Sequence, residues 1–295
     1  MAKDTGPDLP QRPDPAGGRD LQGVTVLVTG ASSGIGAAAA RGFGARGATV
    51  AVIGRSPERT AAVAGSVGGR AHIADFGRLD DVRRLAAELL AAHARIDVLA
   101  NNAGGLFTRR TTSADGHEMT FQVNHLAPFL LTNLLLDRLI AAPRGGRVIN
   151  TSSDVHRMGR LDLEDLDCRR GRRSLLRAYP ASKLATILFT RELSRRTADT
   201  ALIAAAFHPG LVATELGRGS AVFGPLMRTR LARALLTSPE RGAEPLLYLA
   251  TEPDTQALNG AYFNRLTREE PKNEQAHDAD LARRLWERSA ELTGL

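Results

Sequence analysis

The 295-residue sequence predicts an α/β protein in which helices cover both faces of a parallel, doubly wound β-sheet. Short runs rich in Val, Ile and Ala alternate with longer amphipathic stretches, which is the pattern of βαβ units. The length suits one large domain, and hydrophobic and charged fractions of 43% and 24% are typical of soluble globular proteins. We expect a flexible tail over 1–20, where Pro, Gly and Asp are frequent, followed by a single domain over 21–295.

Each expected element has its own local pattern. Short apolar runs predict strands at 24–28, 49–53, 71–74, 97–101, 147–151, 201–207 and 260–263. Amphipathic stretches predict helices at 35–47, 57–67, 78–94, 117–140, 178–197, 239–250 and 277–293. Pro128 interrupts the pattern of the fourth helix. Segments near 155–177 and 213–237 break the alternation, and we expect loops or small helices beside a site.

Composition and charge argue against several classes of partner. The net charge of +7 and pI near 10.4 suggest nucleic acid, but the arginines are interleaved with acidic residues, and no zinc finger or basic arm is present. No apolar run approaches the ~18 residues of a membrane span, and the N-terminus lacks the apolar core of a signal peptide. Cys168 is the single cysteine, so no intramolecular disulfide can form. We expect a cytoplasmic protein without nucleic acid, membrane anchor or metal.

A glycine-rich turn follows the first strand in VTVLVTGASSGIG. Its spacing, G-x-x-x-G-x-G, differs from the standard dinucleotide fingerprint, but the glycines still allow a pyrophosphate to approach the backbone at the next helix N-terminus. A tight packing turn is the alternative. The candidate cofactor-binding residues of this turn are Gly30, Ser32, Ser33, Gly34, Ile35 and Gly36.

The end of the second strand discriminates between the two nicotinamide dinucleotides. An NAD site has an acidic residue there, which binds the ribose hydroxyls. This chain instead continues Ile53-Gly54-Arg55, and a guanidinium can bind the 2′-phosphate that a carboxylate would repel. Arg55 therefore favours NADP(H), with a plain surface arginine as the alternative.

A tyrosine and a lysine four residues apart occur in AYPASKLATILF, at Tyr179 and Lys183. Lysine is rare here, because the 39 basic residues include only Lys3, Lys183 and Lys272. On the expected helix 178–197 the two side chains share a face. An ammonium near a phenol is expected to move the phenol pKa from near 10 toward neutral pH, which would make Tyr179 a general acid/base.

Further polar residues follow the later strands, at the edge where open α/β sheets bind ligands. NNAG follows the fourth strand, Ser152 and Ser153 follow the fifth, and the HPG of 208–210 follows the sixth. Asn124 lies on the fourth expected helix. Each has a structural alternative as a cap, turn or loop residue, but their order along one βαβ chain indicates a single site.

Together these motifs resemble those of the classical short-chain dehydrogenase/reductase family, from about Gly23 to the C-terminus. DGHEMTFQVNHLAPFLLTNLLLDRL, YPASKLATILFTRELSRR and ARRLWERSAELTGL are similar to its retinol dehydrogenase-like subgroup, as is the long gap between Ser153 and Tyr179. The resemblance implies a Rossmann-type fold in one domain. It also implies a catalytic tetrad of Asn124, Ser153, Tyr179 and Lys183.

The resemblance implies NADP(H) as the cofactor. Asp75 would contact the adenine, with a loop cap as its alternative role, and Asn101 would lie near the adenosine ribose. Beyond the glycine-rich turn, the implied cofactor-binding residues are Arg55, Asp75, Phe76, Asn102, Ala103, Gly104, Tyr179, Lys183, Pro209, Gly210, Val212 and Thr214.

The implied activity is the interconversion of a small apolar aldehyde or ketone and its alcohol by hydride transfer. Tyr179 would be the general acid/base, Ser153 would bind the reacting oxygen, and Lys183 would hold the nicotinamide ribose. The segments near 155–177 and 213–237 would line the pocket. Its apolar candidates are Leu211, Leu216, Val222, Phe223 and Met227, with ordinary core residues as the alternative. The alternatives are a redox-neutral biosynthetic step (epimerisation, dehydration or cyclisation) and an NADP(H)-sensing regulator.

Three smaller expectations complete the interpretation. Helices 117–140 and 178–197 often form subunit contacts in this family, which makes a homodimer or homotetramer an option. High Ala and Arg usage suggests a GC-rich bacterial genome and secondary metabolism. His156 and His208 are expected to be satisfied structural histidines, and Cys168 is expected to have no catalytic role.

Overall fold

Strand β1 (Thr25–Thr29) runs parallel to β2 (Thr49–Gly54) on one side and to β4 (Val98–Asn101) on the other. This computed structural model describes residues 20–107, 111–168, 174–211 and 237–295. The sheet continues from β2 to β3 (Arg70–Ile73), and from β4 to β5 (Arg147–Thr151), β6 (Ile203–His208), β7 (Tyr262–Asn264) and β8 (Thr267–Glu269). Within the described residues it has eight strands in the order β3-β2-β1-β4-β5-β6-β7-β8.

The direction in which the sheet grows reverses between β1 and β4. β1 to β3 extend the sheet one way, whereas β4 returns to the other side of β1 and the later strands extend it away from β3. In doubly wound sheets, ligands bind in the crevice outside the carboxyl ends of the strands at such a switch point. The switch point lies at Thr29 and Asn101, the last residues of β1 and β4, and this is where a ligand crevice is expected.

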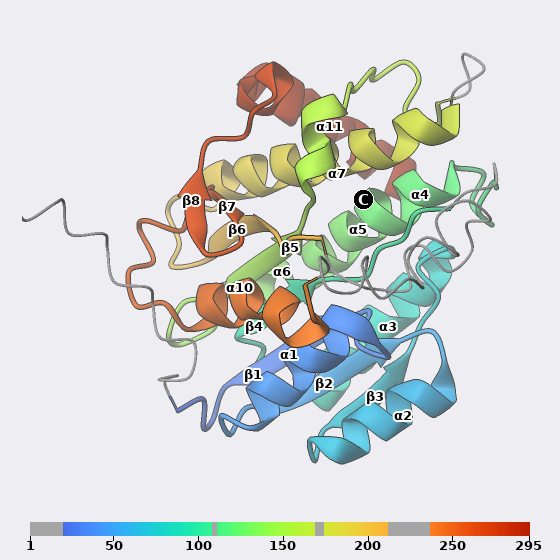
Figure 1. The fold of residues 1–295 in the computed structure, drawn as a ribbon. Helices are drawn as coiled ribbons and strands as arrows, with labels where there is room; N and C mark the ends of the chain where they lie inside the picture. The colour runs from blue at the N-terminus through green and yellow to red at the C-terminus, as the bar shows by residue number, and fades with distance from the viewer. Residues whose placement is uncertain (1–19, 108–110, 169–173, 212–236) are drawn as a thin grey trace, which may run out of the picture.

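Helices cover both faces of the sheet (Figure 1). One face carries α1 (Gly34–Gly44), α2 (Pro57–Ser66) and α10 (Pro239–Thr251). The other carries α3 (Leu79–Ala92), α4 (Met119–Phe121), α5 (Ala127–Leu134), α6 (Leu136–Ile140), α7 (Ser174–Arg196) and α11 (Ala279–Thr293). The predicted α/β class and doubly wound, Rossmann-type arrangement in a single domain are confirmed.

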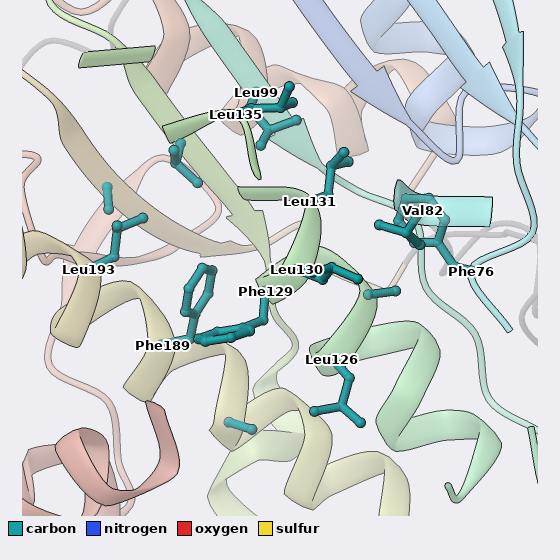
Figure 2. Close-up of a cluster of buried hydrophobic side chains, with 14 of the residues drawn as sticks. Phe76, Val82, Leu99, Leu126, Phe129, Leu130, Leu131, Leu135, Phe189 and Leu193 are labelled. Atoms are coloured by element: carbon teal, nitrogen blue, oxygen red, sulfur yellow. The ribbon is translucent and has the colours of Figure 1, made fainter. Parts of the chain in front are cut away.

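Alternate residues along each strand supply the two hydrophobic cores. Leu27 and Leu99 belong to the core under α3, α5 and α7, whereas Val26 and Val98 belong to the core under α1 and α10. Figure 2 shows part of the first core, where the labelled Leu99, Phe129 and Phe189 come from β4, α5 and α7. Burial on both faces explains why the strands are continuous apolar runs.

The eighth strand was not expected from the sequence. β8 has the sequence TRE, pairs antiparallel with β7 and is mostly exposed. A short, polar edge strand has no apolar signal, because nothing packs over its outer side. β7 also begins later than expected, at Tyr262 instead of 260.

The continuous helix predicted over 117–140 is wrong in detail. α4 begins at Met119, a π-helical turn η1 (Gln122–Leu126) follows, and α5 and α6 are separated at Leu135. Pro128 lies in the first turn of α5, where its missing N–H is tolerated. The proline therefore starts a helix immediately after a widened turn and does not end one.

None of the described helices combines the length and apolarity that crossing a bilayer requires.

The C-terminal helix α11 packs against α5 and α7. The ring of Trp286 lies 4.9 Å from Phe129 and 5.7 Å from Phe189, measured between centroids, and the Arg196 guanidinium lies 4.7 Å from it. His125 Nε2 and Ser289 Oγ form a buried hydrogen bond of 2.8 Å. The contacts of α11 therefore join the last turns of the chain to the helices beside the centre of the fold.

Replacing Trp286 by Ala should lower the free energy of unfolding by about 2 to 3 kcal/mol, because a half-buried aromatic ring and its cation–π contact are lost. Urea unfolding followed by circular dichroism measures this change. Trp286→Phe, which keeps an aromatic ring beside Phe129, should lose less than half as much. An unchanged unfolding midpoint in Trp286→Ala would show that α11 adds little to stability.

Candidate active site

Lys183 and Tyr179 lie one turn apart on α7, at the carboxyl end of β5. Lys183 is only 5% exposed, and its Nζ donates a 2.9 Å hydrogen bond to the carbonyl of Thr151, the last residue of β5. Its Nζ lies 5.7 Å from the centroid of the Tyr179 ring. The half-buried Tyr179 side chain forms a hydrogen bond with Ser153. The fold thus brings a phenol, an ammonium and a hydroxyl together.

The two serines after β5 have different environments. Ser152 is 2% exposed, and its hydroxyl donates a 2.9 Å hydrogen bond to the Lys183 carbonyl, so it fastens α7 to the sheet. Ser153 is half-buried, and its hydroxyl faces Val155 N–H at 3.5 Å and the Tyr179 side chain. Of the two, Ser153 is therefore the serine placed to meet a substrate oxygen.

Asn124 joins three segments of the site. Its Oδ1 accepts a 2.8 Å hydrogen bond from Gly105 N–H, and its Nδ2 donates to Gly105 O at 3.1 Å and to Ser182 Oγ at 3.0 Å. A Cβ built on Gly104 would lie 3.1 Å from Asn124 Oδ1 and 3.4 Å from Lys183 Nζ. The Asn124 side chain is therefore fully used in holding the NNAG segment against α7.

The backbone carbonyl of Asn124 lacks its ordinary helical hydrogen-bond donor. Pro128, four residues later, has no N–H, so the ordinary helical hydrogen bond to the Asn124 carbonyl cannot form. Asn124 and Pro128 both line a cavity of about 10 Å³, which is about the space of one water molecule. Asn101 Oδ1 and Thr151 Oγ1, from residues that also line it, are buried and have no hydrogen-bond partner. Thr151, whose carbonyl accepts the hydrogen bond from Lys183, also lines this small cavity.

Asn101 does not have the position expected for a ribose contact. It is 4% exposed, and its Nδ2 donates 2.9 Å hydrogen bonds to Thr132 Oγ1 and Asn150 Oδ1. Its place in β4 points this side chain into the core side of the sheet, so the expectation was wrong. The NNAG motif identifies Asn101, but it does not predict toward which face of the sheet the Asn101 side chain points.

Burial changes the pKa values of both titratable groups on α7. Burial lowers the pKa of Lys183 from 10.5 to about 8. Burial also raises the pKa of Tyr179 above its ordinary value, and the hydrogen bond with Ser153 offsets only part of that rise. The expected lowering of the Tyr179 pKa is therefore wrong for this structure, because loss of hydration outweighs the hydrogen bond and Lys183 directs its ammonium at Thr151.

The glycine-rich turn and the NNAG segment form one surface. Gly30 has a φ of +66°, and a Cβ there would lie 2.7 Å from Ala103 Cα. A Cβ on Gly36 would lie 2.5 Å from the Gly30 carbonyl oxygen. Thr29 Oγ1 accepts hydrogen bonds from the N–H groups of Asn102 and Ala103, at 3.0 and 2.9 Å. Thr29, which the sequence analysis did not single out, is thus the side chain that joins the two motifs.

The N-terminus of α1 is suited to an anion. Ser33 is the N-cap residue, yet its side chain makes no capping hydrogen bond, and the first turn holds no acidic residue. Free N–H groups and the helix dipole then favour a phosphate group. A Cβ on Gly54 would lie 3.0 Å from Ser32 Cβ, so β2 ends beside this turn. The exposed Arg55 follows, and among the described residues it has no acidic partner.

The remaining candidate cofactor-binding residues differ in whether the side chain or only the backbone could contact a ligand. Ile35 and Phe76 are 8% and 6% exposed, so their backbones and not their side chains can face a ligand. Asp75 is half-buried and accepts a 3.0 Å hydrogen bond from Gly77 N–H, which is the capping role considered for it. Pro209 and Gly210 follow β6 and are buried.

Some candidates cannot be placed. Val212, Thr214, Leu216, Val222, Phe223 and Met227 lie outside the described residues, as do 169–173 of the first substrate segment and nearly all of the second. The residues flanking 212–236 meet, because Thr237 N–H donates a 2.8 Å hydrogen bond to Leu211 O. Met158 and Leu211 are 73% and 72% exposed, the highest values among the large apolar residues described, and both follow strands of the site.

The histidines near the site are not fully satisfied, contrary to expectation. Among the described residues, His156 Nε2 and His208 Nδ1 are buried without a hydrogen-bond partner. No group of three metal-ligating side chains occurs in the described residues. Burial raises the pKa of the Cys168 thiol to about 11, which disfavours a reactive thiolate.

Comparison with protein families matches residues 24–221 to the short chain dehydrogenase family. A Streptomyces sp. (strain C5) protein, provisionally named a daunorubicin C-13 ketoreductase (DnrU), is 43% identical over 97% of both chains. Human retinol dehydrogenase 13 is 40% identical over 93% of this chain and 86% of its own length.

Solved structures with this fold include related bacterial proteins. A crystal structure of an uncharacterized protein from Mycobacterium paratuberculosis is 36% identical, with a TM-score of 0.76 over 95% of this chain and 97% of that one. A Shigella flexneri short chain dehydrogenase complexed with NADP is 26% identical, with a TM-score of 0.65 over 84% of this chain and 100% of that one.

The buried Lys183 should make stability depend on pH. Between its folded pKa of about 8 and the ordinary 10.5, the unfolded chain binds more protons at this site than the folded protein. Its contribution to the free energy of unfolding therefore increases with pH across that window, by at most about 1.4 kcal/mol per pH unit, and the cost of burying the charge is largest below pH 8. Lys183→Met should remove this slope and be no less stable than the wild type at pH 7.

Urea unfolding of the wild type and Lys183→Met, at several pH values from 7 to 10, measures that difference. Lys272→Met, which removes an exposed lysine, is the control and should keep the wild-type slope. Equal slopes in all three proteins would show that the Lys183 ammonium is not destabilised by burial.

Proposed function

The chain belongs to the short-chain dehydrogenase/reductase family of oxidoreductases, and on this premise we propose that it is an NADP(H)-dependent carbonyl reductase. Its reaction interconverts an apolar aldehyde or ketone and its alcohol. The observation that carries the proposal is the grouping of Tyr179, Ser153 and Lys183 at the end of β5, with Asn124 holding the neighbouring segment. The dinucleotide, when bound, supplies or accepts the hydride.

The residues of the chain would handle the proton and the oxygen. Tyr179 donates its hydroxyl proton to the carbonyl oxygen, and Ser153 donates a hydrogen bond to the same oxygen as negative charge develops. Burial keeps the Tyr179 pKa high, so the phenol is protonated at neutral pH, as the reductive direction requires. Lys183 keeps a positive charge beside the phenolate left after transfer, and the small polar cavity gives the proton a return route.

NADP(H) fits the residues at the other end of the crevice. Gly30 and Gly36 leave the backbone open to close approach, and the N-terminus of α1 offers unpaired N–H groups without a competing carboxylate. Arg55 provides a guanidinium where an NAD site would carry an acid. These residues would hold the pyrophosphate and the 2′-phosphate, respectively.

The substrate should be apolar. Met158 and Leu211 expose large side chains beside the site, and apolar surface of this kind is a favourable wall for a hydrophobic ligand. The names of two relatives, a daunorubicin C-13 ketoreductase and a retinol dehydrogenase, suggest ketones on polycyclic molecules and long apolar aldehydes as probes.

The two alternatives differ in what they require of the tetrad. A redox-neutral biosynthetic step would use the same four groups without net consumption of NADPH. A sensor of NADP(H) would bind the dinucleotide but has no need of Tyr179 held beside Ser153 and Lys183. The intact arrangement favours an enzyme.

NADPH oxidation by the purified protein, followed by absorbance with a panel of apolar aldehydes and polycyclic ketones, tests the proposal. Tyr179→Phe should reduce kcat by about 10²- to 10⁴-fold, because it removes the proton donor, while the Kd for NADPH stays within about twofold. Wild-type turnover retained in Tyr179→Phe would contradict the mechanism. NADPH bound but not consumed with any substrate would favour the sensor, and product formed without net NADPH change would favour the redox-neutral step.

Arg55→Asp should change the choice of cofactor. Loss of a charge-assisted hydrogen bond and addition of a repelling carboxylate should lower the ratio of kcat/KM for NADPH to that for NADH by about 10- to 100-fold. Arg144→Asp, an exposed arginine before β5 at the opposite end of the strands, is the control and should keep the wild-type ratio. An unchanged ratio in Arg55→Asp would assign the 2′-phosphate to another residue.

A further inference from the structure

The turn that carries Ser153 is held from within by a buried histidine. Ser153 is followed by the 3-10 turn η2 (Asp154–Met158), and His156 in this turn is 1% exposed. His156 Nδ1 lies 2.8 Å from the carbonyl oxygen of Ser153, and its backbone N–H donates to the same oxygen at 3.0 Å. One carbonyl, that of the proposed catalytic serine, therefore accepts from both the backbone N–H and the ring Nδ1 of His156.

The identity of its partner fixes the tautomer of His156. A carbonyl oxygen only accepts, so Nδ1 must carry the ring proton. Burial lowers the pKa of His156, which keeps the ring neutral. Nε2 is then an acceptor, and it is buried without a partner beside the Tyr262 ring, whose centroid is 4.9 Å from that of His156. Nδ1 is therefore the ring atom of His156 that holds the turn, and the rest of the ring packs against Tyr262.

The same turn is held from outside by a residue far along the chain. Asn273 Nδ2 donates hydrogen bonds to His156 O at 2.8 Å and to Gly159 O at 2.9 Å, with a longer one of 3.3 Å to Arg157 O. The next anchor, Gln275, bonds Leu161 N–H and O at 2.9 and 3.0 Å. Segment 273–275 thus clamps the polypeptide that leads away from Ser153.

Ser153 needs this external support, because its own turn holds its hydroxyl weakly. The hydrogen bond from Val155 N–H to Ser153 Oγ is 3.5 Å long, at the limit of a hydrogen bond. A serine hydroxyl can rotate among three staggered positions, so a weak local hydrogen bond does not hold it in one of them. The backbone of Ser153 must therefore be fixed for the hydroxyl to stay beside the phenol.

We propose that His156 and Asn273 are positioning residues that fix the Ser153 turn and so keep the Ser153 hydroxyl against Tyr179. This rests on the proposed role of Ser153 and Tyr179, but not on the identity of the substrate. Neither side chain needs to touch the substrate or the dinucleotide. Both act through the backbone of one turn, one from inside the fold and one from the C-terminal segment.

Two readouts separate positioning from a general loss of structure. The hydrogen bond with Ser153 lowers the pKa of Tyr179, so a loosened turn should raise the pH at which the phenolate forms. The chain has only three tyrosines, and the phenolate absorbance of Tyr179 follows from subtracting the titration of Tyr179→Phe. The charged and titratable groups near this turn and ring stay unchanged in every variant; they are Lys183, Asp154, Arg157, His208, Tyr262 and Arg265.

The experiment compares His156→Asn, His156→Gln, His156→Ala and Asn273→Ala, each with and without Tyr179→Phe. Asn places an N–H close to the position of Nδ1, whereas Gln places it close to Nε2. We expect His156→Ala, His156→Gln and Asn273→Ala to raise the Tyr179 midpoint by about half to one pH unit and to lower kcat about tenfold, with the Kd for NADPH unchanged. His156→Asn should restore both values.

His72→Asn, which alters another buried histidine, on the distant strand β3, is the matched control and should leave the Tyr179 midpoint unchanged. A midpoint that does not move in His156→Ala and Asn273→Ala, or rescue by Gln and not by Asn, would overturn the inference. Because the titration needs no turnover, a wild-type protein inactive on every carbonyl would count against the proposed function while leaving this test decisive.

Discussion

Burial of the Lys183 ammonium is the constraint on which the rest of the site depends. A cation in the interior needs an acceptor and open space around it, and here the acceptor is a carbonyl at the last residue of a central strand. The hydrogen bond from Lys183 to Thr151 requires α7 to pack close to β5. The Ser152 hydroxyl, which donates to the Lys183 carbonyl, holds the same turn of α7. A Cβ at Gly104 would crowd both Asn124 Oδ1, at 3.1 Å, and Lys183 Nζ, at 3.4 Å. Tyr179 and Ser153 contact each other next to the Lys183 ammonium, whose position the Thr151 carbonyl fixes.

The fold, and the residues that gather at the candidate site, could be predicted because both depend on local sequence patterns. Apolar runs and helical spacing gave the layers, and motifs at strand ends necessarily gather at one edge of a parallel sheet. Properties created by burial could not be predicted in the same way. The direction of the Tyr179 pKa shift, the inward orientation of Asn101 and the π-helical turn before Pro128 all depend on neighbours distant in sequence. Thr29 and Asn273 were missed, and His156 was expected to be only a structural histidine. Their partners lie far along the chain or in the backbone, where no motif marks them.

The two ends of the crevice are built from different kinds of interaction. At the α1 end, the surface consists of backbone N–H groups and glycines. The exposed guanidinium of Arg55 lies after the end of β2, which adjoins this turn. At the α7 end, the titratable groups are buried, so small changes in hydration have large effects on their protonation. The residues that we propose for cofactor choice and those that we propose for proton chemistry are therefore separate, so each set can be altered by mutation on its own.

The packing of α11 also bears on how copies of this chain can assemble. The helix lays Trp286 against Phe129 and Phe189 and joins Ser289 to His125, so it occupies outer surface of α5 and α7. Two subunits could meet through that covered surface only after each had released its own last helix. The C-terminal helix therefore gives α5 and α7 a neighbour from within the same chain over the part of their surface that it covers.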